Sequence, residues 1–185
     1  MEFLTHLWLP ILVCSVAVWI VSAIFWMALP HHKGDFKSLP DEQKFMDFMK
    51  AANIPPGVYG YPDFRNCKDP NAPDGKKNWN EGPMGLLNVW PKINMRRNMI
   101  LTFLVNLVVT ILIAYLGHET IPMGAPFAKV MQVVGTAGVL AYAFAFLPNH
   151  IWFGANRSAT WSSVFDGVVY GLVTGAIFGL MWPAR

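Results

Sequence analysis

The sequence has few charged residues and almost no cysteine. Only 14% of its 185 residues are Asp, Glu, Lys or Arg, whereas 54% are hydrophobic, which is too apolar for an ordinary soluble domain. The two cysteines lie in different settings, Cys14 inside an apolar run and Cys67 in a polar segment. This separation argues against a disulfide and against a cysteine-based metal site.

Residue sets typical of catalysis are also missing. The chain contains no phosphate-binding loop, no paired acids and no recognisable combination of serine, histidine and acid. The run from Gly82 to Gly85 has the composition of a turn. We therefore predict no catalytic residues, and a protein that is not an enzyme.

The positive charge is unevenly distributed. Of the 14 Lys and Arg residues, 11 lie between residues 30 and 98. The net charge of +3 therefore describes one segment rather than a nucleic-acid-binding surface, and no nucleic-acid partner is expected.

Four apolar stretches are long enough to cross a lipid bilayer. They are residues 7–29, 99–116, 127–147 and 161–182. The first has no basic segment before it and no cleavage site after it, which favours a membrane anchor over a signal peptide. The sequence predicts an all-α integral membrane protein with three parts: the first span (1–29), a polar segment (30–98) and a three-helix region (99–185).

The last span carries four glycines at every fourth position, which form one groove along a helix. In a bilayer such a groove lets another backbone approach closely. The third span has a comparable row of alanines beside Gly138, so we expect the two spans to pack together, although another polypeptide is an alternative mate. The predicted packing residues are Gly167, Gly171, Gly175, Gly179, Ala137, Ala141 and Ala145.

Polar residues also occur within the spans. Thr102, Asn106 and Thr110 share a helix face, which predicts an inward-facing surface that bonds to other helices. Asp166 is the only acid within a span, and we expect it to pair with Arg157, with His150 or with the region of Lys33. A substrate or ion site at Asn106, and a proton or ion pathway at Asp166, are the functional alternatives.

Three histidines, His31, His32 and His150, are expected on one side of the membrane. Three imidazoles can hold a metal ion, and two can hold a haem. However, none of the three lies deep in a span, and no acid is evidently spaced as their partner. We therefore predict no cofactor and no metal, with these histidines as the only candidates.

The polar segment is expected to contain a short amphipathic helix that starts at Ser38 and ends at Asn53. Two β-prone runs, residues 58–62 and 84–90, flank a turn-rich stretch that contains residues 73–75. They predict a small hairpin or an ordered extended loop.

Four spans place both termini on one side of the membrane. Of the Lys and Arg residues, 12 lie in the two segments on the other side, and six of them are close to helix ends. The positive-inside rule therefore predicts a cytoplasmic segment 30–98 and periplasmic termini.

Several runs resemble uncharacterised small four-helix proteins of the bacterial inner membrane. The runs are residues 29–35, 56–62, 82–85 and 165–183. The resemblance implies a bacterial inner-membrane location, and it implies no activity and no functional residues.

The number of packing surfaces favours a non-catalytic accessory subunit that assembles or stabilises a larger inner-membrane complex, such as a respiratory or photosynthetic one. Its partners would be the lipid bilayer and other integral membrane subunits. A small ion or solute channel or transporter is the first alternative, and a haem- or metal-bearing electron carrier is the second.

Overall fold

The computed structural model describes residues 2–63, 65 and 73–184. This part of the chain is mostly helical and divides into two compact units. The first unit comprises Met1–Phe36, Met95–Ile151 and Ala155–Arg185, and the second comprises Lys37–Asn94 with Trp152–Gly154.

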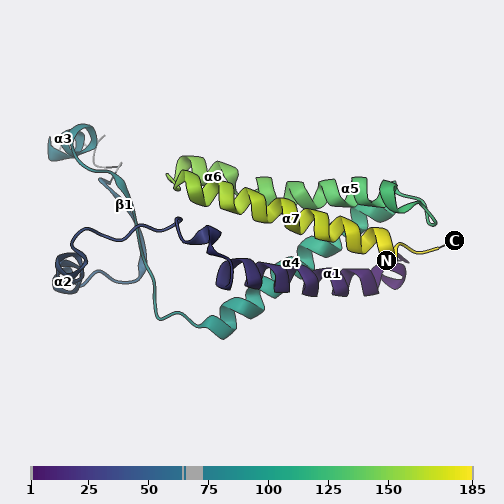
Figure 1. Ribbon diagram of the computed structural model, residues 1–185. Coiled ribbons are helices and arrows are strands. Elements are labelled where there is room, and N and C mark those ends of the chain that lie inside the picture. Colours follow the sequence, from purple (N-terminus) through teal and green to yellow (C-terminus); the bar gives the residue numbers. More distant parts are fainter. Residues whose placement is uncertain (1, 64, 66–72, 185) are drawn as a thin grey trace. The chain divides into compact units, whose positions relative to one another are not determined.

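The first unit is built on helices that are long and apolar enough to cross a membrane. They are α1 (Glu2–Met27), α4 (Met95–Thr120), a third helical span (Phe127–Trp152) and α7 (Arg157–Met181). The start of α1 and the end of α7 lie at the same end of this unit (Figure 1). The prediction of four apolar helices of membrane-spanning length is confirmed.

The helices extend beyond the predicted apolar stretches. Helix α4 has 26 residues, whereas hydropathy predicts a span over residues 99–116. Its additional turns contain Arg96 and Arg97 at the start, and His118 and Glu119 at the end. An apolar run marks the part that fits hydrocarbon, but backbone hydrogen bonding continues into the polar interface.

The sequence predicted one regular helix over residues 127–147 for the third span, but the structure shows an interrupted one. Helix α5 (Phe127–Val139) is followed by a π-helical turn, η3 (Leu140–Phe144), and then by α6 (Leu147–Trp152). A π turn contains more residues than an α turn, so it changes which side chains face a neighbouring helix.

The glycine groove of α7 lies against α5, and this pair makes the most extensive helix contact in the molecule (Figure 1). A Cβ added at Gly171 would overlap the backbone of Val139, and one added at Gly175 would lie 2.8 Å from the Cα of Gly135. The two backbones therefore touch, and only glycine leaves room for this contact.

The ends of the groove are equally close to the third span. A Cβ at Gly167 would overlap Ala143 in the π turn, and one at Gly179 would lie 2.6 Å from the ring of Phe127. The groove thus packs within the chain along its whole length.

The predicted alanine row does not meet the groove. Gly135, Gly138 and Ala143 occupy that face instead, while Ala145 is exposed. Ala137 and Ala141 line a groove of about 440 Å³ together with residues of α4. Ala137 lies in the regular part of the span, where Gly135 and Gly138 form the face toward α7 and Ala137 faces α4. The π turn changes the face only for the residues from Leu140 onward.

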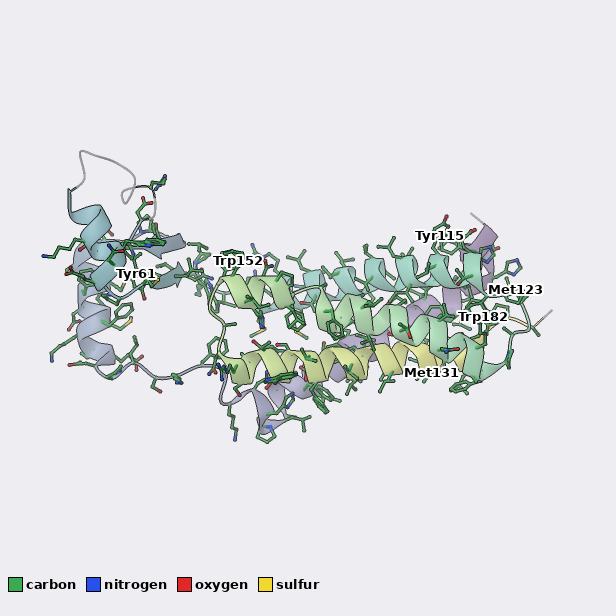
Figure 2. All side chains as sticks on the ribbon, turned by 90° about the horizontal axis from the view of Figure 1, so that it is seen from above. Tyr61, Tyr115, Met123, Met131, Trp152 and Trp182 are labelled. Atoms are coloured by element: carbon green, nitrogen blue, oxygen red, sulfur yellow. The ribbon has the colours of Figure 1, made fainter. Side chains whose placement is uncertain are left out.

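Aromatic side chains link the other helices. Trp19 of α1 donates from Nε1 to the carbonyl of Met99 in α4, at 3.1 Å. Trp182, which follows α7, donates to the carbonyl of Pro122 at the same distance. Figure 2 shows Trp182, Tyr115 and Met123 at one end of the helices, an arrangement typical of an interfacial belt.

The second unit contains two helices and a two-stranded sheet. Its elements are α2 (Glu42–Ala52), β1 (Gly57–Tyr61), α3 (Pro73–Glu81) and β2 (Gly85–Val89). The strands pair antiparallel, with Gly57 opposite Val89. They coincide with the two runs that the sequence marked as β-prone. Pro73 begins a helix rather than a turn, since proline suits a first helical position.

Helix α2 is capped by Asp41, whose carboxylate accepts from the Lys44 amide at 3.2 Å. Ser38, the predicted cap, lies before the helix. Asn53 ends α2 in the left-handed conformation, with φ of 49°, which asparagine tolerates.

Larger residues in the groove should weaken the packing of α5 and α7. We expect Gly171→Leu and Gly175→Leu each to lower the melting temperature in detergent clearly, because overfilling a close contact costs about 1–3 kcal/mol or more. Leu172→Val, on the exposed face of the same helix, is the control and should change it little. Equal melting temperatures for all three variants would contradict a packing role for the groove.

Candidate metal centre

A short 3-10 turn, η1 (Pro30–His32), follows α1 and presents two adjacent histidines. Proline at its first position favours the turn. The Lys33 amide donates to the carbonyl of Pro30 at 3.0 Å, and the Asp35 amide donates to that of His32 at 3.1 Å. The sequence after α1 therefore folds back on itself.

Both histidines contact one carboxylate, Asp166 of α7. The Nε2 atom of His31 lies 2.8 Å from Asp166 Oδ1, and the Nε2 atom of His32 lies 2.8 Å from Asp166 Oδ2. The Tyr170 hydroxyl, one turn further along α7, donates to Oδ2 at 3.3 Å. Each carboxylate oxygen is therefore faced by a different imidazole.

Two further hydrogen bonds hold the η1 segment to the start of α7. Ser162 donates to the carbonyl of His31 at 3.1 Å. Asn156, the residue that caps α7, donates to the carbonyl of Gly34 at 3.0 Å. These contacts fix the backbone on both sides of the histidines.

A second carboxylate contacts His32 from the other side. The Nδ1 atom of His32 lies 2.6 Å from Asp35 Oδ2. The other oxygen of Asp35 is buried and has no hydrogen-bond partner among the described residues. A carboxylate behind a histidine is the usual arrangement that orients an imidazole ligand toward a metal ion.

The position of His32 sets a proton requirement. Both of its ring nitrogens face carboxylate oxygens, but a neutral imidazole carries only one N–H. Either the ring is protonated, or a cation replaces one proton between Nε2 and Asp166. Burial lowers the pKa of His32, but the hydrogen bonds and charges of Asp35 and Asp166 outweigh burial and raise the pKa above its ordinary value.

The charges of the site can balance in two ways. Two ionised carboxylates carry two negative charges, which can be compensated either by two imidazolium rings, those of His31 and His32, or by one divalent cation. A divalent cation bound to neutral imidazoles would neutralise both carboxylates, and the neutral form is favoured where water is scarce.

The donor set suits a transition metal. One ligand atom each from His31, His32 and Asp166 lie within 4.8 Å of one another. Imidazole and carboxylate ligands bind Zn²⁺ at about 2.0–2.2 Å, so ligand atoms that already contact one another need to separate only slightly. The same donors also suit Fe²⁺ and other divalent first-row ions.

The site is enclosed on most sides. The side chains of Asp166 and His32 are 4% and 6% exposed, and that of His31 is 24% exposed. The Trp26 ring stacks on His32 at 3.9 Å, and Phe25 contacts His31 edge-on at 5.5 Å. Little surface remains through which a large molecule could reach the ligand atoms.

The sequence-based expectations for this site were partly wrong. Helix α7 begins at Arg157, so the Asp166 carboxylate lies about 14 Å along its axis. Its partners are His31 and His32, which lie in the predicted region of Lys33. Neither Arg157 nor His150 pairs with it among the contacts of the described residues.

His150 does not join the cluster. It lies on α6, and its Nδ1 atom is 3.2 Å from the hydroxyl of Thr160. The expectation that no acid accompanies the histidines was also wrong, because Asp35 follows His32 by three residues. That spacing was the available signal, since a tight turn brings positions three apart together.

The predicted polar face of α4 is divided. Asn106 and Thr110 are buried, whereas Thr102 is exposed. Thr110 donates to the carbonyl of Asn106 at 2.8 Å, and Thr102 donates to that of Asn98 at 2.9 Å. Both hydroxyls thus bond within their own helix, and neither contributes to the histidine site.

Comparison with protein-family models, curated proteins and solved structures found no match to this chain.

Proposed function

We propose that this protein is a non-catalytic, metal-binding subunit of a bacterial inner-membrane assembly. The observation that carries the proposal is the position of His32 between two buried carboxylates, Asp35 and Asp166. A divalent transition-metal cation bound by His31, His32 and Asp166 satisfies these groups in both charge and geometry. This proposal replaces the sequence-based expectation of a chain without a metal.

The enclosure of the site supports a structural role for the metal. Structural metal sites are closed, whereas catalytic sites keep a position open for water or substrate. Here aromatic rings contact both histidines, and His31, His32 and Asp166 would supply the ligand atoms. The metal would fasten η1, and with it the end of α1, to α7.

The outer surface of the bundle supports assembly with another membrane subunit. Ala137 and Ala141 line the groove between α5 and α4, together with Val109, Leu112 and Leu116. Small residues in such a groove let a further transmembrane helix approach closely. The occupant would be a helix of a partner subunit.

The distribution of Lys and Arg supports a cytoplasmic location for residues 30–98 and a periplasmic location for both termini. The metal site would then lie toward the cytoplasmic side of the membrane.

Purified protein is incubated with Zn²⁺ and desalted, and its zinc content is measured by elemental mass spectrometry. It should retain about one Zn²⁺ per chain. Asp166→Asn and His32→Gln each remove a ligand and should abolish most of this binding. Asp35→Asn should weaken affinity by roughly 10- to 100-fold, because it loosens the orientation of His32.

His150→Gln is the matched control, because it removes a histidine that was predicted on the same side of the membrane but lies outside the cluster. This variant should bind as much Zn²⁺ as the wild type does. Chelation should lower the melting temperature of the wild type but not that of Asp166→Asn. Equal zinc content in all variants, or none in the wild type, would show that the cluster is only a hydrogen-bonded network.

Filling the groove should prevent assembly. We expect the wild type to migrate within a larger complex on a native gel of mildly solubilised membranes, and Ala141→Phe to migrate alone. Leu172→Phe places the same ring on the exposed face of α7 and should leave the complex intact. Migration of the wild type alone would refute the subunit role.

Cysteine labelling tests the orientation. In a Cys14→Ala background, an impermeant maleimide should label Cys67, which lies outside the described residues, only after the cells are permeabilised. Cys14 is buried and its thiol contacts Thr174 at 3.4 Å, so its replacement by alanine is a small change. Labelling of Cys67 in intact cells would show that the orientation is the opposite of the one proposed.

A further inference from the structure

The second unit encloses a pocket of about 880 Å³ between α2 and the two-stranded sheet. Phe45 and Phe48 line it from the helix, Tyr59 and Leu87 line it from the sheet, and Tyr61, labelled in Figure 2, lies at the same pocket. The volume is within the range of about 300–1,000 Å³ that is typical of small-molecule sites.

The described part of the unit has no fully buried side chain, since none between Lys37 and Asn94 is buried. Helix α2 has an apolar face formed by Phe45, Phe48, Met49 and Ala52. Phe45 and Met49 are only half-buried, and Phe48 and Ala52 are exposed. A folded unit normally buries such faces, so an occupant of the pocket would supply the missing apolar contacts.

The lining identifies the chemistry of the occupant. None of the lining residues carries a charge. The hydroxyl of Tyr59 already donates to the carbonyl of Pro55 at 2.9 Å. The lining therefore offers few hydrogen-bonding groups to a polar ligand. A flexible alkyl chain needs no polar partner and fits this lining.

The sequence identifies the source of that chain. Residues 37–94, which hold the pocket, carry 8 Lys and Arg against 7 Asp and Glu, so charge does not select the occupant, whereas the place of the unit in the chain does. The segment is joined covalently at both ends to helices long and apolar enough to cross a membrane. We propose that the pocket between α2 and the sheet binds one acyl chain of a phospholipid from the surrounding bilayer.

A photoreactive residue tests this directly in the full-length protein. Phe45, which is half-buried at the pocket, is replaced by benzoylphenylalanine, and the protein is reconstituted in nanodiscs of phosphatidylglycerol and phosphatidylcholine. After illumination, the intact mass should increase by one phospholipid. The matched control carries the same residue at Val58, which is 68% exposed and pairs with Asn88, and it should give little adduct.

A second pair of variants separates pocket binding from general contact with lipid. Leu87→Glu places a charge in the lining and should lower the yield of the Phe45 adduct by at least about fivefold, because an unpaired charge is unfavourable in an apolar site. Val58→Glu adds the same charge outside the lining and should leave the yield unchanged. Circular dichroism checks that both variants remain folded.

Three results would overturn the proposal. A doubled mass would show that a second copy of the chain occupies the pocket. An unchanged mass would show that no lipid enters it. Equal adducts at positions 45 and 58 would show that lipid contacts the whole unit without selecting the pocket.

Discussion

Direct backbone contact between α5 and α7 sets the orientation on which the histidine site depends. The glycines that permit this contact begin at Gly167, immediately after Asp166. When one face of α7 lies flat on α5, the neighbouring face turns toward the end of α1 and η1. A side chain added at Gly167 would rotate or displace α7 and move the carboxylate away from both imidazoles.

A second constraint follows from the low polarity around the helices. A buried carboxylate among apolar helices, such as that of Asp166, is stable only with partners that compensate its charge and donate hydrogen bonds to it. His31 and His32 meet that need, and Asp35 in turn orients His32. The cluster is thus built in two layers, although its parts come from opposite ends of the sequence.

The sequence was sufficient for the four long apolar helices and for the glycine face of α7, because both depend on local periodicity. It was not sufficient for the face of the third span, because small residues lie on two faces of α5 and only the tertiary structure shows that the face of Gly135 and Gly138 meets α7. The π turn at Leu140–Phe144 also has no periodic signature in the sequence. Asp166 was recognised as unusual from its position in an apolar run. The region of Lys33, which contains both histidine partners, was one of three alternatives. The sequence could not choose among them, because pairing across more than 130 residues depends on how the helices assemble.

The contacts of His31 and His32 with Asp166 join positions 135 and 134 residues apart in the chain. Unlike a disulfide, these contacts are lost when the chain unfolds, so closing a loop of this length costs chain entropy on folding, and this cost increases with loop length. They also need no oxidising compartment. Because Asp166 lies on the last long helix, the turn that follows the first helix gains its partner only after nearly the whole chain has been made.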